Sequence, residues 1–206
     1  MNGAGLRYML EDLMPPLADV VRWVFPDAPH TASPESALGI AALLGVFRAK
    51  PPNLEWWNAS EDGRTYNGWD TTRESLRSIV EREAALGGGR VGVFGFSQGA
   101  AVAAALAGLS EQGAFPKLDF AVLVAGFVPR ADAIAPLFAV PLRIPSLHVW
   151  GSSDSFARHA PALRDRFAPE TRAELEWPGR HVVPTSGAPA EALIDFVRRH
   201  SADPGR

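Results

Sequence analysis

The chain has 206 residues with a hydrophobic content of 47%, which is enough for one sizeable core and predicts a single domain over residues 1–206. Its net charge of −3, with arginine scattered along the sequence rather than clustered, gives no reason to expect a nucleic-acid or membrane-surface partner. The chain contains no cysteine, which excludes disulfides, thiolate metal sites and a cysteine nucleophile.

The N-terminal part is predicted to form a helix, a strand and a second helix. Apolar residues recur at helical spacing over Leu6–Asp19, and the Pro15-Pro16 pair should end or bend that helix. Val20–Phe25 is predicted to be a strand because it is largely apolar and a proline-rich turn follows it. Ser33 should cap a helix over Pro34–Arg48. That helix is apolar nearly all round, so it is expected to be core or a hydrophobic flap over a pocket.

A long segment without clear periodicity follows over Lys50–Trp69. It carries the aromatic residues Trp56, Trp57, Tyr66 and Trp69. Long aromatic-rich loops in compact domains usually have a function or cover something, so we expect Trp56, Trp57 and the preceding apolar helix to form one wall of a pocket. The alternative is that one or both of these tryptophans belong to the core.

The segment Arg90–Leu109 has the most informative pattern in the chain. An apolar, β-branched run ends at Gly95-Phe96-Ser97-Gln98-Gly99 and an alanine-rich run follows, which predicts a strand, a tight turn and a helix. In that context Gly-x-Ser-x-Gly is typical of a nucleophilic serine, here Ser97. Side chains two residues before and after the serine should collide with neighbouring backbone, so both glycines are expected to be required. The alternative is an ordinary strand-to-helix turn that carries a serine.

The rest of the chain alternates apolar segments with helical ones. Strands are predicted at Phe120–Ala125, Ser146–Trp150 and Ala173–Trp177. Helices are predicted at Thr71–Leu86, Ala131–Phe138, Phe156–Phe167 and Pro189–His200. The strands are apolar on both faces, so the predicted fold class is α/β, with a mostly parallel sheet of about five to six strands covered by helices on both faces.

Three polar residues follow the carboxyl ends of predicted strands, where such sheets place their sites. Ser97 follows the strand of the serine turn, Asp154 follows Ser146–Trp150, and His181 follows Ala173–Trp177. A serine hydroxyl needs a base to take its proton, a histidine accepts and returns that proton near neutral pH, and a buried carboxylate fixes the histidine tautomer. The order serine, acid, histidine is the one that α/β-hydrolases use. We therefore expect these three residues to be catalytic.

The acid of this set has competing interpretations. Asp154 could instead cap the helix that begins near Phe156. Asp119 and Asp132 are rival acids, but Asp119 precedes its strand and Asp132 lies well beyond the end of its strand. The catalytic interpretation requires Asp154 to face His181.

The remaining histidines are less well placed than His181 for the role of base. His148 is expected in the core, and His159 and His200 on helix surfaces, whereas His30 ends a predicted strand and could reach the pocket. The histidines show no metal-ligand spacing, so no metal is expected. Phe127 and Phe156 lie beside strand ends and are expected to line the pocket.

The sequence resembles the family of serine hydrolases that includes the ovarian-cancer-associated esterase and the fungal thioesterases that release polyketides. The matching stretches span most of residues 20–185: Phe25–Pro29, Glu55–Trp57, Tyr66, Asp70–Leu76, Gly95–Ala100, Pro145–Val149 and His181–Pro184. The resemblance implies an α/β-hydrolase fold and hydrolysis of an ester or thioester without a cofactor. Carried over by position, it implies a triad of Ser97, Asp154 and His181, with the backbone N–H of Gln98 as an oxyanion donor.

One departure from this family concerns the first strand of the fold. Relatives open with an apolar strand that ends in His-Gly and positions a second oxyanion donor, and that strand would lie before Met1 here. Either Met1 is an internal start of a longer protein, or this protein manages without the strand. In the second case we expect Val20–Phe25 to pair directly with Val91–Phe94, and we expect weak catalysis compared with a version extended upstream.

Two functional classes therefore stay open. The first is a serine hydrolase that cleaves a carboxylic ester or thioester of a small to medium acyl group through an acyl-enzyme, with His30, Trp57, Phe127 and Phe156 binding the substrate. The second is a catalytically crippled hydrolase, or an acyl-ligand-binding protein, with an incomplete oxyanion hole. The intact triad favours the first class, and the missing strand favours the second.

The sequence also bears on where the protein acts. No apolar run approaches the ~20 residues that span a bilayer, and the N-terminus lacks the order of a signal peptide. We expect a cytoplasmic protein whose partner is a small-molecule ester or thioester. The oligomeric state stays open.

Overall fold

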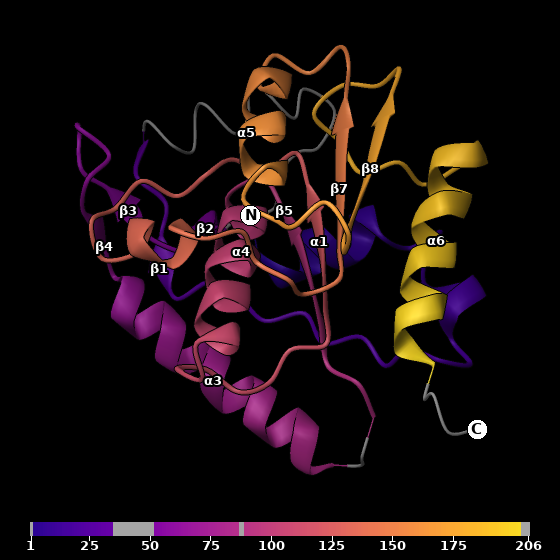
Figure 1. Cartoon of the computed structure of the whole chain (residues 1–206), viewed down its shortest axis with the longest axis horizontal. Coiled ribbons are helices and arrows are strands. Elements are labelled where there is room, and N and C mark those ends of the chain that lie inside the picture. Colours follow the sequence, from indigo (N-terminus) through magenta and orange to yellow (C-terminus); the bar gives the residue numbers. More distant parts are fainter. Residues whose placement is uncertain (1, 35–51, 87–88, 203–206) are drawn as a thin grey trace.

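A four-stranded parallel sheet forms the centre of the computed structural model, which describes residues 2–34, 52–86 and 89–202. The strands are β5 (Gly92–Phe96), β6 (Phe120–Val124), β7 (Ser146–Gly151) and β8 (Arg172–Trp177), and they lie side by side in this order (Figure 1). Every residue of β6 and β7 is buried, as expected for strands covered on both faces. The predicted α/β class is confirmed, and the carboxyl ends of all the strands meet at one edge of the sheet.

Helices cover both faces of the sheet. α3 (Trp69–Ala85) and α4 (Gln98–Glu111) pack on one face, and α1 (Gly3–Met9) and α6 (Gly187–Ser201) pack on the other (Figure 1). Alternate residues of β6 belong to two separate apolar cores. Ala121 and Leu123 pack with α4, whereas Val122 and Val124 pack with α1 and α6.

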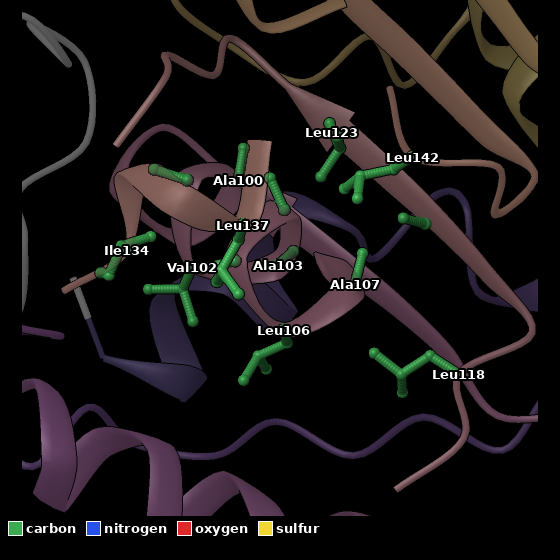
Figure 2. Packing of buried hydrophobic residues seen from close by; sticks show 14 of the residues in the cluster. Ala100, Val102, Ala103, Leu106, Ala107, Leu118, Leu123, Ile134, Leu137 and Leu142 are labelled. Carbon is green, nitrogen blue, oxygen red and sulfur yellow. The ribbon is translucent and has the colours of Figure 1, made fainter. Parts of the chain in front are cut away.

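Helix α4 packs closely on the sheet because most of its inward side chains are small. Residues Ala100–Gly108 are buried without a break. Figure 2 shows Ala100, Ala103 and Ala107 on this helix with Leu123 of β6 and Leu137 nearby. A Cβ on Gly108 would lie 3.0 Å from Cβ of Leu137. This packing holds the first turn of α4, which follows the serine turn, in a fixed place over the sheet.

The long aromatic segment contributes to two small antiparallel pairs of strands, each strand two residues long. β1 (His30–Thr31) pairs antiparallel with β2 (Leu54–Glu55), and β3 (Asn58–Ala59) pairs antiparallel with β4 (Tyr66–Asn67). No strand was predicted there, because strands of two residues carry no readable periodicity.

Several predicted helices are shorter or more irregular than expected. α1 ends at Met9, and a turn leads to the 3-10 helix η1 (Pro15–Leu17), where two prolines interrupt a continuous helix. The region predicted over Phe156–Phe167 contains the 3-10 helix η3 (Ala157–His159) and the helix α5 (Ala160–Arg164). The short helix expected near Ala131–Phe138 is the 3-10 helix η2 (Ala135–Phe138). The helix predicted over Pro34–Arg48 lies, apart from Pro34, outside the described residues.

The strand predicted at Val20–Phe25 is wrong. These residues form no strand, and the sheet has four strands instead of about five to six. Burial nevertheless alternates along the segment, with Val21, Trp23 and Phe25 half-buried and Val20, Arg22 and Val24 exposed. The sequence therefore has the alternating pattern of a strand. A strand also needs a neighbouring strand to form hydrogen bonds with, and the alternating pattern does not show whether one is present.

Direct pairing of Val20–Phe25 with β5 is wrong as well. Within the described residues β5 pairs only with β6. Trp23 contacts β5 through its side chain, edge-on to Phe94 with 6.1 Å between ring centroids. A cavity borders both segments. In the described part of the chain, β5 is therefore an edge strand whose outer side faces this cavity.

Candidate active site

Ser97 lies on the tight turn between β5 and α4. Its backbone angles are φ 55° and ψ −120°, a conformation that residues with a side chain rarely adopt. A Cβ on Gly95 would lie 2.3 Å from the carbonyl oxygen of Gly99, so position 95 requires glycine as expected. A Cβ on Gly99 would meet only Nε1 of Trp56, at an ordinary 3.5 Å. The expectation that position 99 also requires glycine for lack of space is therefore wrong.

The structure brings Ser97, His181 and Asp154 together in one hydrogen-bonded row. Nε2 of His181 lies 3.1 Å from Oγ of Ser97, and Nδ1 of His181 lies 2.7 Å from Oδ2 of Asp154. The three residues follow β5, β8 and β7, so the parallel sheet places them at one edge. Asp154 and His181 are buried, at 7% and 6% exposure, which shields their contact from water.

Asp154 faces His181, and the alternative that it caps the following helix is wrong, because the N-cap of η3 is Phe156 and that helix has no side-chain cap. Its Oδ1 accepts the backbone N–H of Phe156 at 2.7 Å, while Oδ2 faces His181. A carboxylate has enough acceptor sites for both tasks. The turn contact with Phe156 fixes the carboxylate and leaves the second oxygen for the histidine.

The loops after β7 and β8 hold the acid and the histidine in place. Ser152 N–H donates to the carbonyl of Trp177 at 2.8 Å, and Ser153 N–H donates to the carbonyl of Gly179 at 2.9 Å. A Cβ on Gly151 would lie 2.2 Å from the carbonyl oxygen of Gly179, so only glycine allows the two loops to approach this closely.

A large cavity of about 1380 Å³ opens at Ser97. Its wall includes Gln98, Phe127, Phe156 and His181 near the serine, and it continues along β5 beside residues 20–26. A small cavity of about 50 Å³ adjoins Ser97 on the side of His181, and Phe127, Phe156 and His159 line it. The expected positions of Phe127 and Phe156 beside the serine are thus the observed ones.

His159 lines both cavities, although the sequence placed it on a helix surface. It lies in η3, a 3-10 turn, where the helical spacing that suggested an outward position does not apply. No sequence signal marks it as part of the site.

The other expected substrate-binding residues lie deeper or farther away. His30 faces Gly68, with 3.0 Å between its Nε2 and the carbonyl oxygen, and it is not among the residues that line either cavity. Trp57 is 2% exposed and stacks on Tyr66 with 4.3 Å between ring centroids. It belongs to the core cluster and reaches the cavity wall from within it.

His148 is the buried core histidine that its strand position predicted. It is 2% exposed, its Nε2 lies 3.2 Å from Oγ of Ser146, and its ring meets Phe167 edge-on. Burial, followed by the nearby charges of Arg172 and Arg164, lowers the pKa of His148 from 6.5 to about 3. The side chain is therefore neutral in the folded protein near neutral pH.

The N–H groups near the oxyanion position differ in how they are engaged. Gln98 is the first residue of α4, where backbone N–H groups have no helical acceptor. Asn2 and Gly3 also border the large cavity, but Gly3 N–H donates to Oδ1 of Asp27 at 2.8 Å, and Gly5 N–H donates to Oδ1 of Asn2 at 2.9 Å. The start of the chain therefore lies beside the large cavity, and the N–H groups of Gly3 and Gly5 are bound to Asp27 and Asn2.

The described residues contain neither a candidate membrane span nor a metal-ligand cluster. No helix there has the length and apolar character needed to cross a bilayer. No group of three or more His, Asp or Glu side chains there is arranged to hold a metal ion.

Several relatives of the chain are named esterases. Esterase OVCA2 of Danio rerio is 35% identical over 210 residues, which cover 96% of this chain and 92% of the relative. Esterase OVCA2 of Mus musculus is 30% identical over 179 residues, with coverage of 82% and 76%. Probable esterase azaC of Aspergillus niger is 32% identical over 195 residues, with coverage of 85% and 72%.

The fold and the family are shown by two further comparisons. The crystal structure of esterase PE8 matches the chain with a TM-score of 0.63 at 18% identity, covering 97% of this chain and 87% of that one, which shows a shared α/β-hydrolase fold. The family model described as "Serine hydrolase (FSH1)" matches residues 1–192. The chain therefore belongs to the FSH1 family of serine hydrolases.

Proposed function

We propose that this protein hydrolyses carboxylic esters or thioesters with Ser97 as nucleophile, His181 as general base and acid, and Asp154 as the carboxylate that orients the histidine. The observation that carries the proposal is the row of contacts from Ser97 Oγ to His181 Nε2 at 3.1 Å and from His181 Nδ1 to Asp154 Oδ2 at 2.7 Å. These separations are within the reach of direct proton transfer.

The reaction has two halves in this proposal. Oγ of Ser97 attacks the carbonyl carbon while its proton passes to Nε2 of His181, and Asp154 stabilises the imidazolium that forms. The backbone N–H of Gln98 binds the negatively charged oxygen of the tetrahedral intermediate. When the bond to the leaving group breaks, His181 protonates that group and an acyl-enzyme remains on Ser97. A water molecule, activated by His181, then releases the acid and restores the serine.

The cavities divide the substrate between acyl group and leaving group. The leaving group must lie on the side of His181, because the histidine protonates it. The small cavity borders Ser97 and His181 and is assigned to the leaving group, although Phe156, His159 and His181 also line the large cavity. The large cavity accepts the acyl group, which would be small to medium and apolar. No cofactor takes part in this chemistry.

The open edge of β5 supports a second candidate. An acyl-ligand-binding protein with an incomplete oxyanion hole would keep the cavity and the three polar side chains but turn over slowly or not at all. Covalent labelling of Ser97 without turnover of acyl esters would favour this candidate.

Hydrolysis of p-nitrophenyl esters and a matching thioester tests the proposal. Ser97→Ala should lower kcat by at least about 10⁴-fold, and it should change stability little because it removes only a hydroxyl group from a half-buried turn residue. His181→Ala should lower activity comparably, because the serine then lacks the base that takes its proton. Turnover that survives in both variants would contradict the proposal and direct attention to Ser152 or Ser186.

A further inference from the structure

We propose that the indole N–H of Trp56 is the second donor of the oxyanion hole, beside the backbone N–H of Gln98. This inference rests on the proposed function and assigns a chemical role to a side chain of the aromatic loop. It depends on the place of Trp56 beside the serine turn, on the state of its N–H group, and on the contacts that hold it there.

Trp56 lies across the two residues that follow the nucleophile. Its backbone N–H donates to Oε1 of Gln98 at 2.8 Å. Its Nε1 lies 3.5 Å from the position that a Cβ of Gly99 would take. It also lines the large cavity, as do Ser97, Gln98 and Gly99. The indole nitrogen therefore lies beside the helix turn at which the charged oxygen of the intermediate is expected.

Among the described residues, the indole N–H of Trp56 has no acceptor, which leaves it available for a substrate oxygen. The residue itself is half-buried. An indole N–H can donate a hydrogen bond but cannot accept one. Its natural partner is therefore an acceptor, such as an oxygen that gains negative charge. Gly3, at the start of the chain, borders the same cavity but has already given its N–H to Asp27.

Three side-chain hydrogen bonds, two made by Gln98 of α4 and one by Thr72 of α3, hold the backbone of Trp56 and Trp57. Gln98 accepts from Trp56 N–H, and its Nε2 donates to the carbonyl of Trp57 at 3.0 Å. Oγ1 of Thr72 donates to the carbonyl of Trp56. Trp57 is itself fixed in the core by its stack on Tyr66. A donor held in this way needs no reorganisation when charge develops, which is what makes an oxyanion hole effective.

Gln98 thus has two separate tasks in this arrangement. Its backbone N–H binds the oxyanion, and its side-chain amide positions Trp56. The amide is a positioning group, because it touches the loop and not the reacting atoms.

Trp56→Phe tests the donor directly, because it removes the N–H and keeps an aromatic wall. We expect kcat to fall about 10²-fold for acetate and hexanoate esters alike, with KM nearly unchanged, as for loss of an interaction made only in the transition state. Trp69→Phe is the matched control: it makes the same substitution at a residue that packs edge-on to Trp57 but lines neither cavity, and it should keep kcat. An unchanged kcat in Trp56→Phe, or a KM effect that grows with acyl length at constant kcat, would overturn the inference.

Gln98→Met tests the positioning role, because it keeps the backbone N–H and removes both side-chain hydrogen bonds. We expect a lower kcat in Gln98→Met and little further loss when Trp56→Phe is added, because both changes disable the same donor. Effects that multiply in the double variant would show that Gln98 does not act through Trp56. Thermal unfolding establishes that each variant is folded. Ser97→Ala in the same assay separates the two questions: turnover that survives it contradicts the proposed function, whereas a normal Trp56→Phe enzyme contradicts only this inference.

Discussion

Trp56 and Trp57 are neighbours in sequence with different surroundings. Trp56 is half-buried beside the serine turn, whereas Trp57 is 2% exposed and packed between Tyr66 and Trp69. The chain bends at Trp56, between β2 and β3, and only Trp57 turns into the core. The expectation that one of the pair belongs to the core is met by Trp57.

Trp57→Ala should therefore affect both stability and substrate binding. Removal of a buried tryptophan costs about 3–5 kcal/mol of unfolding free energy. Because Trp57 also forms part of the cavity wall, KM should rise more for hexanoate than for acetate esters, since apolar burial contributes about 25 cal/mol per Å². Urea unfolding measures the first effect, and steady-state kinetics at low temperature measure the second. An equal rise in KM at every chain length would assign Trp57 to the core alone.

His148 should make the stability of the fold depend on pH. Its pKa is about 3 in the folded protein and 6.5 in the unfolded chain, because burial, followed by Arg172 and Arg164, disfavours the charged ring, with Asp165 opposing them. Between about pH 3 and 6.5, His148 is therefore protonated in the unfolded chain and neutral in the folded protein. Stability from this residue is present above pH 6.5 and falls by about 1.4 kcal/mol per pH unit as the pH is lowered.

The comparison with His148→Gln isolates this effect from the titration of carboxylates. The variant keeps a polar group near Ser146 but has no proton to bind. Urea unfolding at pH 7.5, 5.5 and 4.5 should show that the wild type loses more stability than the variant on acidification. Parallel pH profiles for the two proteins would contradict the assigned pKa of His148.

The residues of the candidate site differ in how far the sequence could identify them. Ser97, Asp154 and His181 each follow a strand, and strand ends in a parallel sheet share an edge, so their proximity could be anticipated. Trp56 and His159 could not, because one lies in an aperiodic segment and the other in a 3-10 turn. Their positions depend on contacts between distant segments, such as the one from Gln98 to Trp56, that no local pattern encodes.

At the scale of elements, the main feature is the edge of β5 that has no strand partner among the described residues. Asp119 N–H donates to the carbonyl of Val91, and Ser97 N–H donates to the carbonyl of Val124. Because successive residues of a parallel strand turn to opposite sides, the backbone groups of Gly92, Phe94 and Phe96 face the cavity. Buried backbone groups need partners, and an additional strand in the cavity would supply them.

A version of the protein extended upstream by an apolar strand ending in His-Gly should be the better catalyst. Asn2 borders the same cavity as Ser97, so a strand joined to it could run beside β5 and end near the serine. It would satisfy the backbone of β5 and add a third donor to the oxyanion hole, beside Gln98 and Trp56, and one such donor typically contributes about 10²–10³ in kcat. The measurement compares kcat and burst labelling of the extended and the 206-residue forms. Equal values would show that the residues described here already complete the site.

The presence or absence of a pairing neighbour explains which strands could be predicted. β6, β7 and β8 pair with neighbours that their apolar runs imply, and all were predicted within two residues at each end. Val20–Phe25 has the alternation of a strand but lies across a cavity from β5, and alternation alone does not reveal whether a partner is present.

At the scale of the whole molecule, two apolar cores on either side of the sheet account for the predicted class. Continuous apolar strands require helices on both faces, and the alanine-rich α4 and the amphipathic α6 provide them. The number of strands was not predictable, because it depends on whether the edge of β5 is filled. The sheet and the helices on its two faces together bring Ser97, His181 and Asp154 to one edge of the sheet.

Covalent labelling with a fluorophosphonate probe, followed by mass mapping of the modified peptide, tests the central claim most directly. The account predicts one label per chain, located on Ser97, and its loss in Ser97→Ala. It also predicts much slower labelling in His181→Ala, because the serine then lacks its base. A label that maps to another serine, or that persists in Ser97→Ala, would contradict the assignment of Ser97 as the nucleophile.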